Sequence, residues 1–216
     1  MIKTLRISLA AAGFAVLLAA CTTPLAADTA FGPQSGTAML VLAGPIASAA
    51  ETIELQRVDL ASSKFEADVV TPGNGGIDGN RMNGDTKGPT WLSPMVVTAG
   101  DYALIGTYIS TFNGVSSGTK WRCMFRGAPV YALTPGSIGI VRAESYSLGA
   151  GAFAASRVSD EAVMQEFTEA RKKFPNIVGE ARIVPPSAMI GFEAADFSLF
   201  SNNSSCSPKP DFQRLK

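Results

Sequence analysis

The run from residue 102 to residue 112 constrains the fold most strongly, because it predicts a β-strand that is covered on both faces. Tyr102 and Leu104 alternate there with Ile105 and Thr107, and aromatic or β-branched residues dominate both faces of the run. A strand of this kind is typical of the centre of a layered β-structure. We therefore expect a layered β-fold built around this run.

Turn signals such as Gly-Pro and Pro-Gly separate the other short β-like runs at intervals of about ten residues. These runs cover residues 37–42, 52–60, 65–70, 91–97, 119–125, 130–133, 138–145, 181–184 and 189–192. In the run 52–60 the alternation slips by one residue, which predicts a β-bulge near Gln56 and Arg57. The pattern predicts a mainly β domain, an antiparallel β-sandwich.

One amphipathic helix is predicted toward the C-terminal end, over about residues 159–174. Ser159 or Asp160 can cap its start, basic residues occupy its last turn, and Pro175 follows it. Its apolar residues form a narrow stripe on one face. The stripe predicts packing against the core and not a membrane or ligand surface.

Residues 1–20 have the three parts of an export signal. Lys3 and Arg6 form a positive start, residues 7–18 form an apolar run, and two small residues precede Cys21. The apolar run is shorter than the ~20 residues that cross a bilayer comfortably. We therefore predict a signal peptide and not a membrane-spanning helix.

Leu18-Ala19-Ala20-Cys21 resembles the lipobox of bacterial lipoproteins, the site where a signal peptide is cut before a lipid-modified cysteine. The resemblance implies a diacylglycerol thioether on Cys21, an acylated amino terminus with chains such as palmitate, and attachment to a membrane. The alternative is a plain signal peptide in which Cys21 has no role. Each buried methylene contributes about 0.8 kcal/mol, so three chains would hold the protein permanently.

The resemblance also implies a location and a division of the chain. Such lipoproteins commonly carry aspartate after the cysteine when they stay at the inner membrane, so Thr22 implies the outer membrane, with the protein facing the periplasm. Residues 21–35 are small and polar and are expected to form a flexible tether. Residues 36–216 are expected to form a single β-rich domain.

Cys123 and Cys206 remain as an even pair once Cys21 is assigned to lipid. In an oxidising compartment such a pair predicts a disulfide, and closing a loop of this length would stabilise the fold by roughly 4–5 kcal/mol. The alternatives are two free thiols or a reactive cysteine, but the chain has no histidine to act as its base.

The absence of histidine excludes Ser-His-Asp and Cys-His catalysis and most zinc and copper sites. No residue is assigned a catalytic, cofactor-binding or metal-binding role. Ser137 lies in Pro-Gly-Ser-Ile-Gly, which indicates a turn and not a nucleophile elbow. The carboxylates are scattered along the chain, and no pair can be placed across a cleft from the sequence.

The segment 71–89 interrupts the β-pattern with glycine, asparagine and aspartate. It suggests either a mobile hairpin loop or a calcium loop built from Asp78, Asn80 and Asp85. Met82 stands where the calcium loop needs a further oxygen ligand, which favours the hairpin loop. Long loops are often functional, so this segment is a candidate contact site for a partner.

Gly100-Asp101-Tyr102, at the start of the central run, resembles the glycine, polar, tyrosine pattern of prealbumin-like and carboxypeptidase-regulatory-like domains. The resemblance implies a sandwich fold and carries over no catalytic residue. Removing the signal leaves 16 basic and 18 acidic residues, a formal charge of −2, which makes nucleic acid an unfavourable partner.

The sequence therefore predicts a lipid-anchored cell-envelope protein that acts as a binding or structural module. Its expected partners are the membrane, through Cys21, and an envelope protein. The alternatives are a carboxylate- or metal-dependent envelope hydrolase and a carrier of an apolar ligand.

Overall fold

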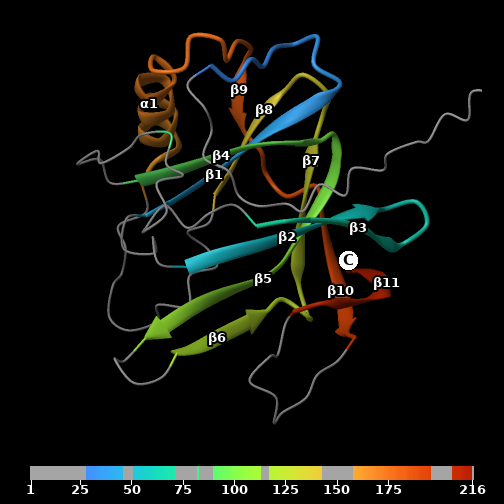
Figure 1. The fold of residues 1–216 in the computed structure, drawn as a ribbon. Helices are drawn as coiled ribbons and strands as arrows, with labels where there is room; N and C mark the ends of the chain where they lie inside the picture. Colours follow the sequence, from blue (N-terminus) through green and yellow to red (C-terminus); the bar gives the residue numbers. More distant parts are fainter. Residues whose placement is uncertain are drawn as a thin grey trace, which may run out of the picture.

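The structure, a computed structural model, describes residues 28–45, 51–71, 82, 90–112, 117–142, 158–195 and 206–215 (Figure 1). Within these ranges the chain forms β1 (Thr37–Pro45), β2 (Glu51–Asp59), β3 (Lys64–Val70), β4 (Thr90–Thr98), β5 (Gly100–Phe112), β6 (Ser117–Cys123), β7 (Ala128–Leu133), β8 (Ile138–Arg142), α1 (Asp160–Arg171), β9 (Ala181–Ile183), β10 (Ala188–Ala194) and β11 (Pro208–Leu215). The predicted mainly β fold with one late helix is confirmed. No helix in the described part of the chain has the length and apolar character needed to cross a membrane.

Six antiparallel strands close into a barrel in the order β2-β3-β11-β10-β7-β5, because β5 also pairs with β2. β6 extends this sheet by pairing with the part of β5 that lies beyond β7. A narrow barrel leaves room only for side chains in its interior. The buried side chains of this interior are Val58, Ala103, Ile105, Ala128, Val130, Ile190, Phe192 and Phe212.

A second sheet, in the order β4-β1-β8-β9, packs on the outside of the barrel. Leu40 and Leu42 of β1 face the barrel and contact a core that includes Tyr102 of β5. Met39 and Val41 face the other way, into a core shared with α1. Residues 38 to 43 of β1 are all fully buried. β1 is therefore covered on both faces, as Tyr102 to Thr107 of β5 are.

This arrangement differs from the expected antiparallel sandwich. Two sheets do pack face to face, but the larger one closes into a barrel, and in the smaller one β8 runs parallel to both β1 and β9. The barrel closes through β11, which no sequence pattern predicted. β11 contains Pro208 and Pro210, and Phe212 is its one buried residue, so it lacks the alternation that marks a strand.

Several local predictions are confirmed. The register between β2 and β3 shifts between Gln56 and Val58, which is the predicted bulge. The Ser159 hydroxyl caps α1 by accepting a hydrogen bond from the Ala162 amide at 3.2 Å. The helix ends at Arg171, however, three residues before the predicted end.

The predicted tether, residues 21–35, is wrong in its last part, because residues 28–35 belong to the domain. Phe31 is 3% exposed and lies in the core between α1 and the second sheet. Its amide donates to the Asn176 carbonyl at 3.0 Å, and its carbonyl accepts from the Val178 amide at 2.8 Å. Figure 1 shows this segment beside the turn that follows α1. The tether prediction for residues 21–27 and the signal peptide, 1–20, lie outside the described residues.

Candidate functional site

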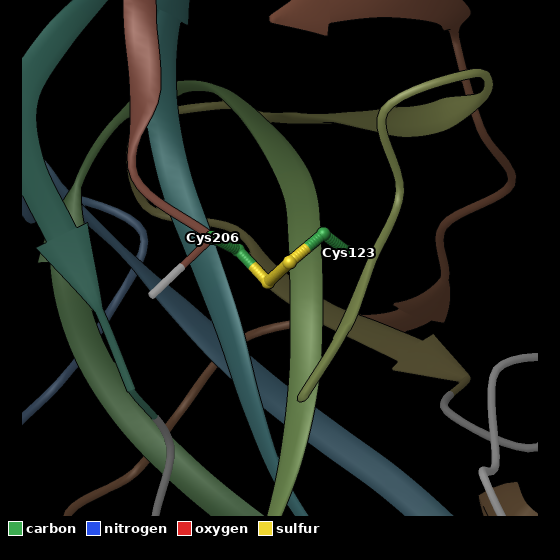
Figure 2. Close-up of a disulfide and its surroundings, with 2 residues drawn as sticks. All are labelled: Cys123 and Cys206. Carbon is green, nitrogen blue, oxygen red and sulfur yellow. A yellow bond between two sulfur atoms is a disulfide. The ribbon is translucent and has the colours of Figure 1, made fainter. Parts of the chain in front are cut away.

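Cys123 and Cys206 form a disulfide, as the sequence predicted (Figure 2). Cys123 ends β6, and Cys206 lies two residues before β11, 83 residues later in the chain. Cys206 is fully buried, which fits a structural bond and not an exposed reactive thiol. The bond fixes the start of the strand that closes the barrel.

The lipidation site Cys21 and most of the segment 71–89, including Asp78, Asn80 and Asp85, lie outside the described residues. Met82 is described, and it is 2% exposed within the core beneath α1. Its amide donates to the Leu92 carbonyl of β4 at 2.8 Å. The side chain that breaks the calcium-loop pattern therefore has a packing role. Within the described residues, no group of three or more acidic or cysteine side chains is placed to hold a metal ion.

A charged hollow of about 430 Å³ lies beside the turn between β2 and β3, and we call it the turn cleft. Its wall includes Arg57, Glu66 and Arg214. The Arg57 guanidinium pairs with the Glu66 carboxylate at 3.2 Å. The Arg214 guanidinium donates to the Leu60 carbonyl at 2.9 Å, on the other side of the turn. Most of the charge in this hollow is therefore engaged in holding the turn.

Two carboxylates of the turn cleft have their pKa values shifted in opposite directions. The Asp59 carboxylate accepts from the Ser62 hydroxyl at 2.7 Å and from the backbone amides of Ala61 and Ser62, which lowers its pKa. Burial is the main cause that raises the pKa of Asp101, with a further rise from the Asp59 charge and an opposing effect of Arg214. An acid and a base with separated pKa values are what a carboxylate hydrolase requires. Here, however, the Asp59 oxygens are used to form a turn.

A second hollow, of about 540 Å³, lies on the outer face of β10 and β11, and we call it the outer groove. Gly191 forms its floor, because the neighbours Ile190 and Phe192 point into the barrel. A Cβ atom at residue 191 would lie 3.4 Å from the Leu215 side chain and 3.5 Å from the Phe125 carbonyl. The missing side chain of Gly191 therefore creates the groove.

Aromatic residues support the outer groove from the barrel side. The Phe192 ring lies 5.2 Å from the Phe125 ring and 5.4 Å from the Phe65 ring, and Phe65 lies 5.3 Å from Phe212. All three pairs meet edge to face, an arrangement that adds about 0.5–1.5 kcal/mol per pair beyond burial. The wall of the groove is therefore held rigidly.

The rim of the outer groove combines apolar and charged groups. Leu215 lines the groove and is 41% exposed, and its cross-strand partner Met189, which lies beside the groove, is 39% exposed. Lys209 and Glu193 pair at 2.6 Å at the other end. A groove lined by aromatic residues together with charges of both signs suits a protein segment better than a highly charged ligand. The sequence gave no signal for this site, because it arises from β11.

The other candidate residues have structural roles. The Ser137 hydroxyl donates to the Thr134 carbonyl at 2.7 Å, in the predicted turn. Ser93 and Thr107 are fully buried, and their hydroxyl oxygens have no hydrogen-bond partner within the described residues. The Tyr102 hydroxyl donates to the Thr98 carbonyl at 2.8 Å, which gives the Gly100-Asp101-Tyr102 pattern a local structural explanation.

Comparisons with known protein families, with curated proteins and with solved structures find no match to this chain. Its function is therefore inferred from its own residues.

Proposed function

We propose that this chain is a cell-envelope lipoprotein, anchored through lipid on Cys21, whose domain acts as a binding or structural module. The observation that carries the proposal is the buried Cys123–Cys206 disulfide. Structural disulfides form in oxidising compartments such as the periplasm. The Cys123–Cys206 bond uses two of the three cysteines. The third, Cys21, directly follows the apolar run of the predicted export signal.

The identity of Thr22 supports the outer membrane, with the domain in the periplasm. The outer groove supports a protein partner, because aromatic residues and the exposed Leu215 line it, and exposed Met189 lies beside Leu215 on the neighbouring strand. The segment 71–89 stays a second candidate contact site.

Two other functions have weaker support. The turn cleft favours a carboxylate hydrolase only through Asp101, because Asp59 is engaged by its own turn. A carrier of an apolar ligand would need an internal cavity, whereas the buried side chains of the described residues pack together in both cores of the barrel region. These two functions therefore have weaker support than an anchored module, which the disulfide and Cys21 support.

Mass spectrometry of the mature protein tests the anchor. We expect a chain that begins at acylated Cys21 and fractionates with membranes, and a Cys21→Ala variant that carries no acyl chains and leaves the membrane fraction. A mature chain with an unmodified Cys21 would disprove the anchor.

In-cell cross-linking and affinity capture test the binding role. Gly191→Phe fills the outer groove, and its Cβ meets its neighbours at ordinary contact distances. Val96→Phe is the matched control, because Val96 is 44% exposed on β4, in the other sheet. We expect a specific envelope protein to be captured with the wild type and the control and lost with Gly191→Phe. Equal capture with all three would exclude the outer groove as the contact site.

A further inference from the structure

We propose that one end of the domain, which we call the anchor end, faces the bilayer and contacts its headgroups. The anchor end consists of residues 28–36, the turn at 134–137 and residues 171–180. The first and last of these lie side by side at the top of Figure 1. The proposal rests on the acylation of Cys21 and adds to it the surface that meets the membrane.

The length of chain between the anchor and the domain is short. Six residues, 22–27, separate Cys21 from Asp28, where the described chain begins. Even fully extended, the seven steps from Cys21 to Asp28 span at most about 25 Å. A compact domain of about 190 residues has a radius of gyration of about 16 Å and so a diameter of about 40 Å. The anchor therefore cannot reach around the domain to let its opposite end face the bilayer.

The point where the chain enters the domain is fixed. Phe31 is held by the two backbone hydrogen bonds to Asn176 and Val178 and by burial in the core beneath α1. The turn at 134–137 closes the same end, since the Gly136 amide donates to the Thr37 carbonyl at 2.7 Å and Gly136 lies against Pro33. The place on the domain surface from which the chain leads to the anchor is therefore fixed by these contacts.

The surface of the anchor end is suited to the headgroup region. Val178 is 53% exposed, the highest exposure among the large apolar side chains of the described residues. It borders a hollow of about 370 Å³ whose other lining residues include Lys172, Phe174 and Pro175. A protruding valine beside lysine and proline can rest among headgroups without entering the hydrocarbon core.

Charge does not set the orientation. The anchor end carries Arg171, Lys172 and Lys173 against Asp28 and Glu180, and the Lys172 ammonium is paired with Glu169 at 2.6 Å. Such a balanced surface gains little from anionic lipids. We therefore expect the same orientation on neutral vesicles and at high salt.

Fluorescence quenching on vesicles tests the orientation. The full acylated protein is reconstituted into phosphatidylcholine vesicles that contain phosphatidylcholine with a spin-labelled headgroup as quencher. A fluorophore is attached to a cysteine introduced by Val178→Cys or Glu180→Cys at the anchor end, or by Glu193→Cys near the far end of β10. The native cysteines do not react, because Cys123 and Cys206 are paired and Cys21 is acylated.

We expect severalfold stronger quenching at residues 178 and 180 than at residue 193, unchanged at high salt. Mass spectrometry of the same samples reports acylation. Equal quenching at both ends of an acylated protein would overturn the orientation alone. A protein without acyl chains would overturn the anchor and the orientation together. Quenching that disappears at high salt would show that charge, and not the anchor, sets the contact.

Discussion

The Sγ atom of Cys206 lies directly over Gly106, so that a Cβ atom at residue 106 would overlap it and would lie 3.0 Å from the Cys206 Cβ. Gly106 is also the cross-strand partner of Cys123. The disulfide therefore crosses β5 at a position that must lack a side chain. Gly106 in β5 therefore leaves the space in which the disulfide joins the start of β11 to the end of β6.

Gly106→Ala should lower the free energy of unfolding by about 1–3 kcal/mol, because the added methyl group displaces the disulfide or β5. Gly36→Ala is the control, since a Cβ at residue 36 would meet no atom within 4 Å. Chemical denaturation of both variants measures the difference. Equal stability of the two would show that the close approach does not constrain β5.

Removal of the disulfide by Cys123→Ala with Cys206→Ala should lower the free energy of unfolding by about 4–5 kcal/mol. Without the bond the unfolded chain is no longer closed into a long loop, so it gains conformational entropy. Hydrogen exchange should show the largest loss of protection in β11, since a single residue pair, Lys64 with Asp211, joins β11 to β3. Loss of protection spread evenly over both sheets would contradict a local role for the bond.

Phe31→Ala should destabilise the domain by about 3–5 kcal/mol, because it empties a site in the core beneath α1. A flexible tether at this position would predict no effect. Gln34→Ala, an exposed change three residues later, should stay within about 0.5 kcal/mol of the wild type. Thermal and chemical unfolding of both variants distinguishes a buried core position at residue 31 from a flexible tether.

Glu54→Gln should stabilise the protein at neutral pH. Burial raises the pKa of Glu54 above 4.5, and its Oε2 atom has no hydrogen-bond partner within the described residues. The folded state therefore binds the proton more tightly than the unfolded chain, and stability falls as the pH rises from 4.5 through the folded pKa. The gain from Glu54→Gln should vanish in acid, which unfolding measured across pH will show. Glu180→Gln, on an exposed side chain, should show no such trend.

Tyr102→Phe should cost about 1 kcal/mol at neutral pH through loss of the hydrogen bond to the Thr98 carbonyl. Burial raises the pKa of Tyr102 from 10.0 to about 12. The folded state thus retains this proton longer than the unfolded chain, so the wild type loses stability as the pH rises from 10 to 12. The variant lacks this loss, and the two stability curves should converge in alkali. Stability curves of the wild type and the variant that stay parallel between pH 10 and 12 would contradict the raised pKa of Tyr102.

Local patterns predicted most of the strands and the helix, because alternation, caps and turn residues act within a few positions. The slip in the alternation near Gln56 became a register shift, and Ser159 became the helix cap. The disulfide followed from counting the cysteines of a chain predicted to be exported. The bulge and the cap depend on residues that lie close together in the sequence, and the disulfide was predicted from the number of cysteines.

The outer groove could not be predicted, because its floor at Gly191 and its rim at Leu215 belong to strands whose pairing the sequence does not encode locally. A glycine in a strand signals a close approach or a gap, but not which one. The turn cleft was missed for a related reason, since Asp59 and Asp101 come together only when β2 pairs with β5.

By itself, the sequence determined a β-rich domain with one late helix and one disulfide, and it predicted export and lipid attachment at Cys21. Only the tertiary structure decided that β11 closes a barrel, that β1 lies between two cores and that Phe31 belongs to the domain core. Each of these depends on contacts between segments that are far apart in the chain. Phe31, Phe212 and Gly106 acquire their roles from partners more than 70 residues away, and no local period records such partners.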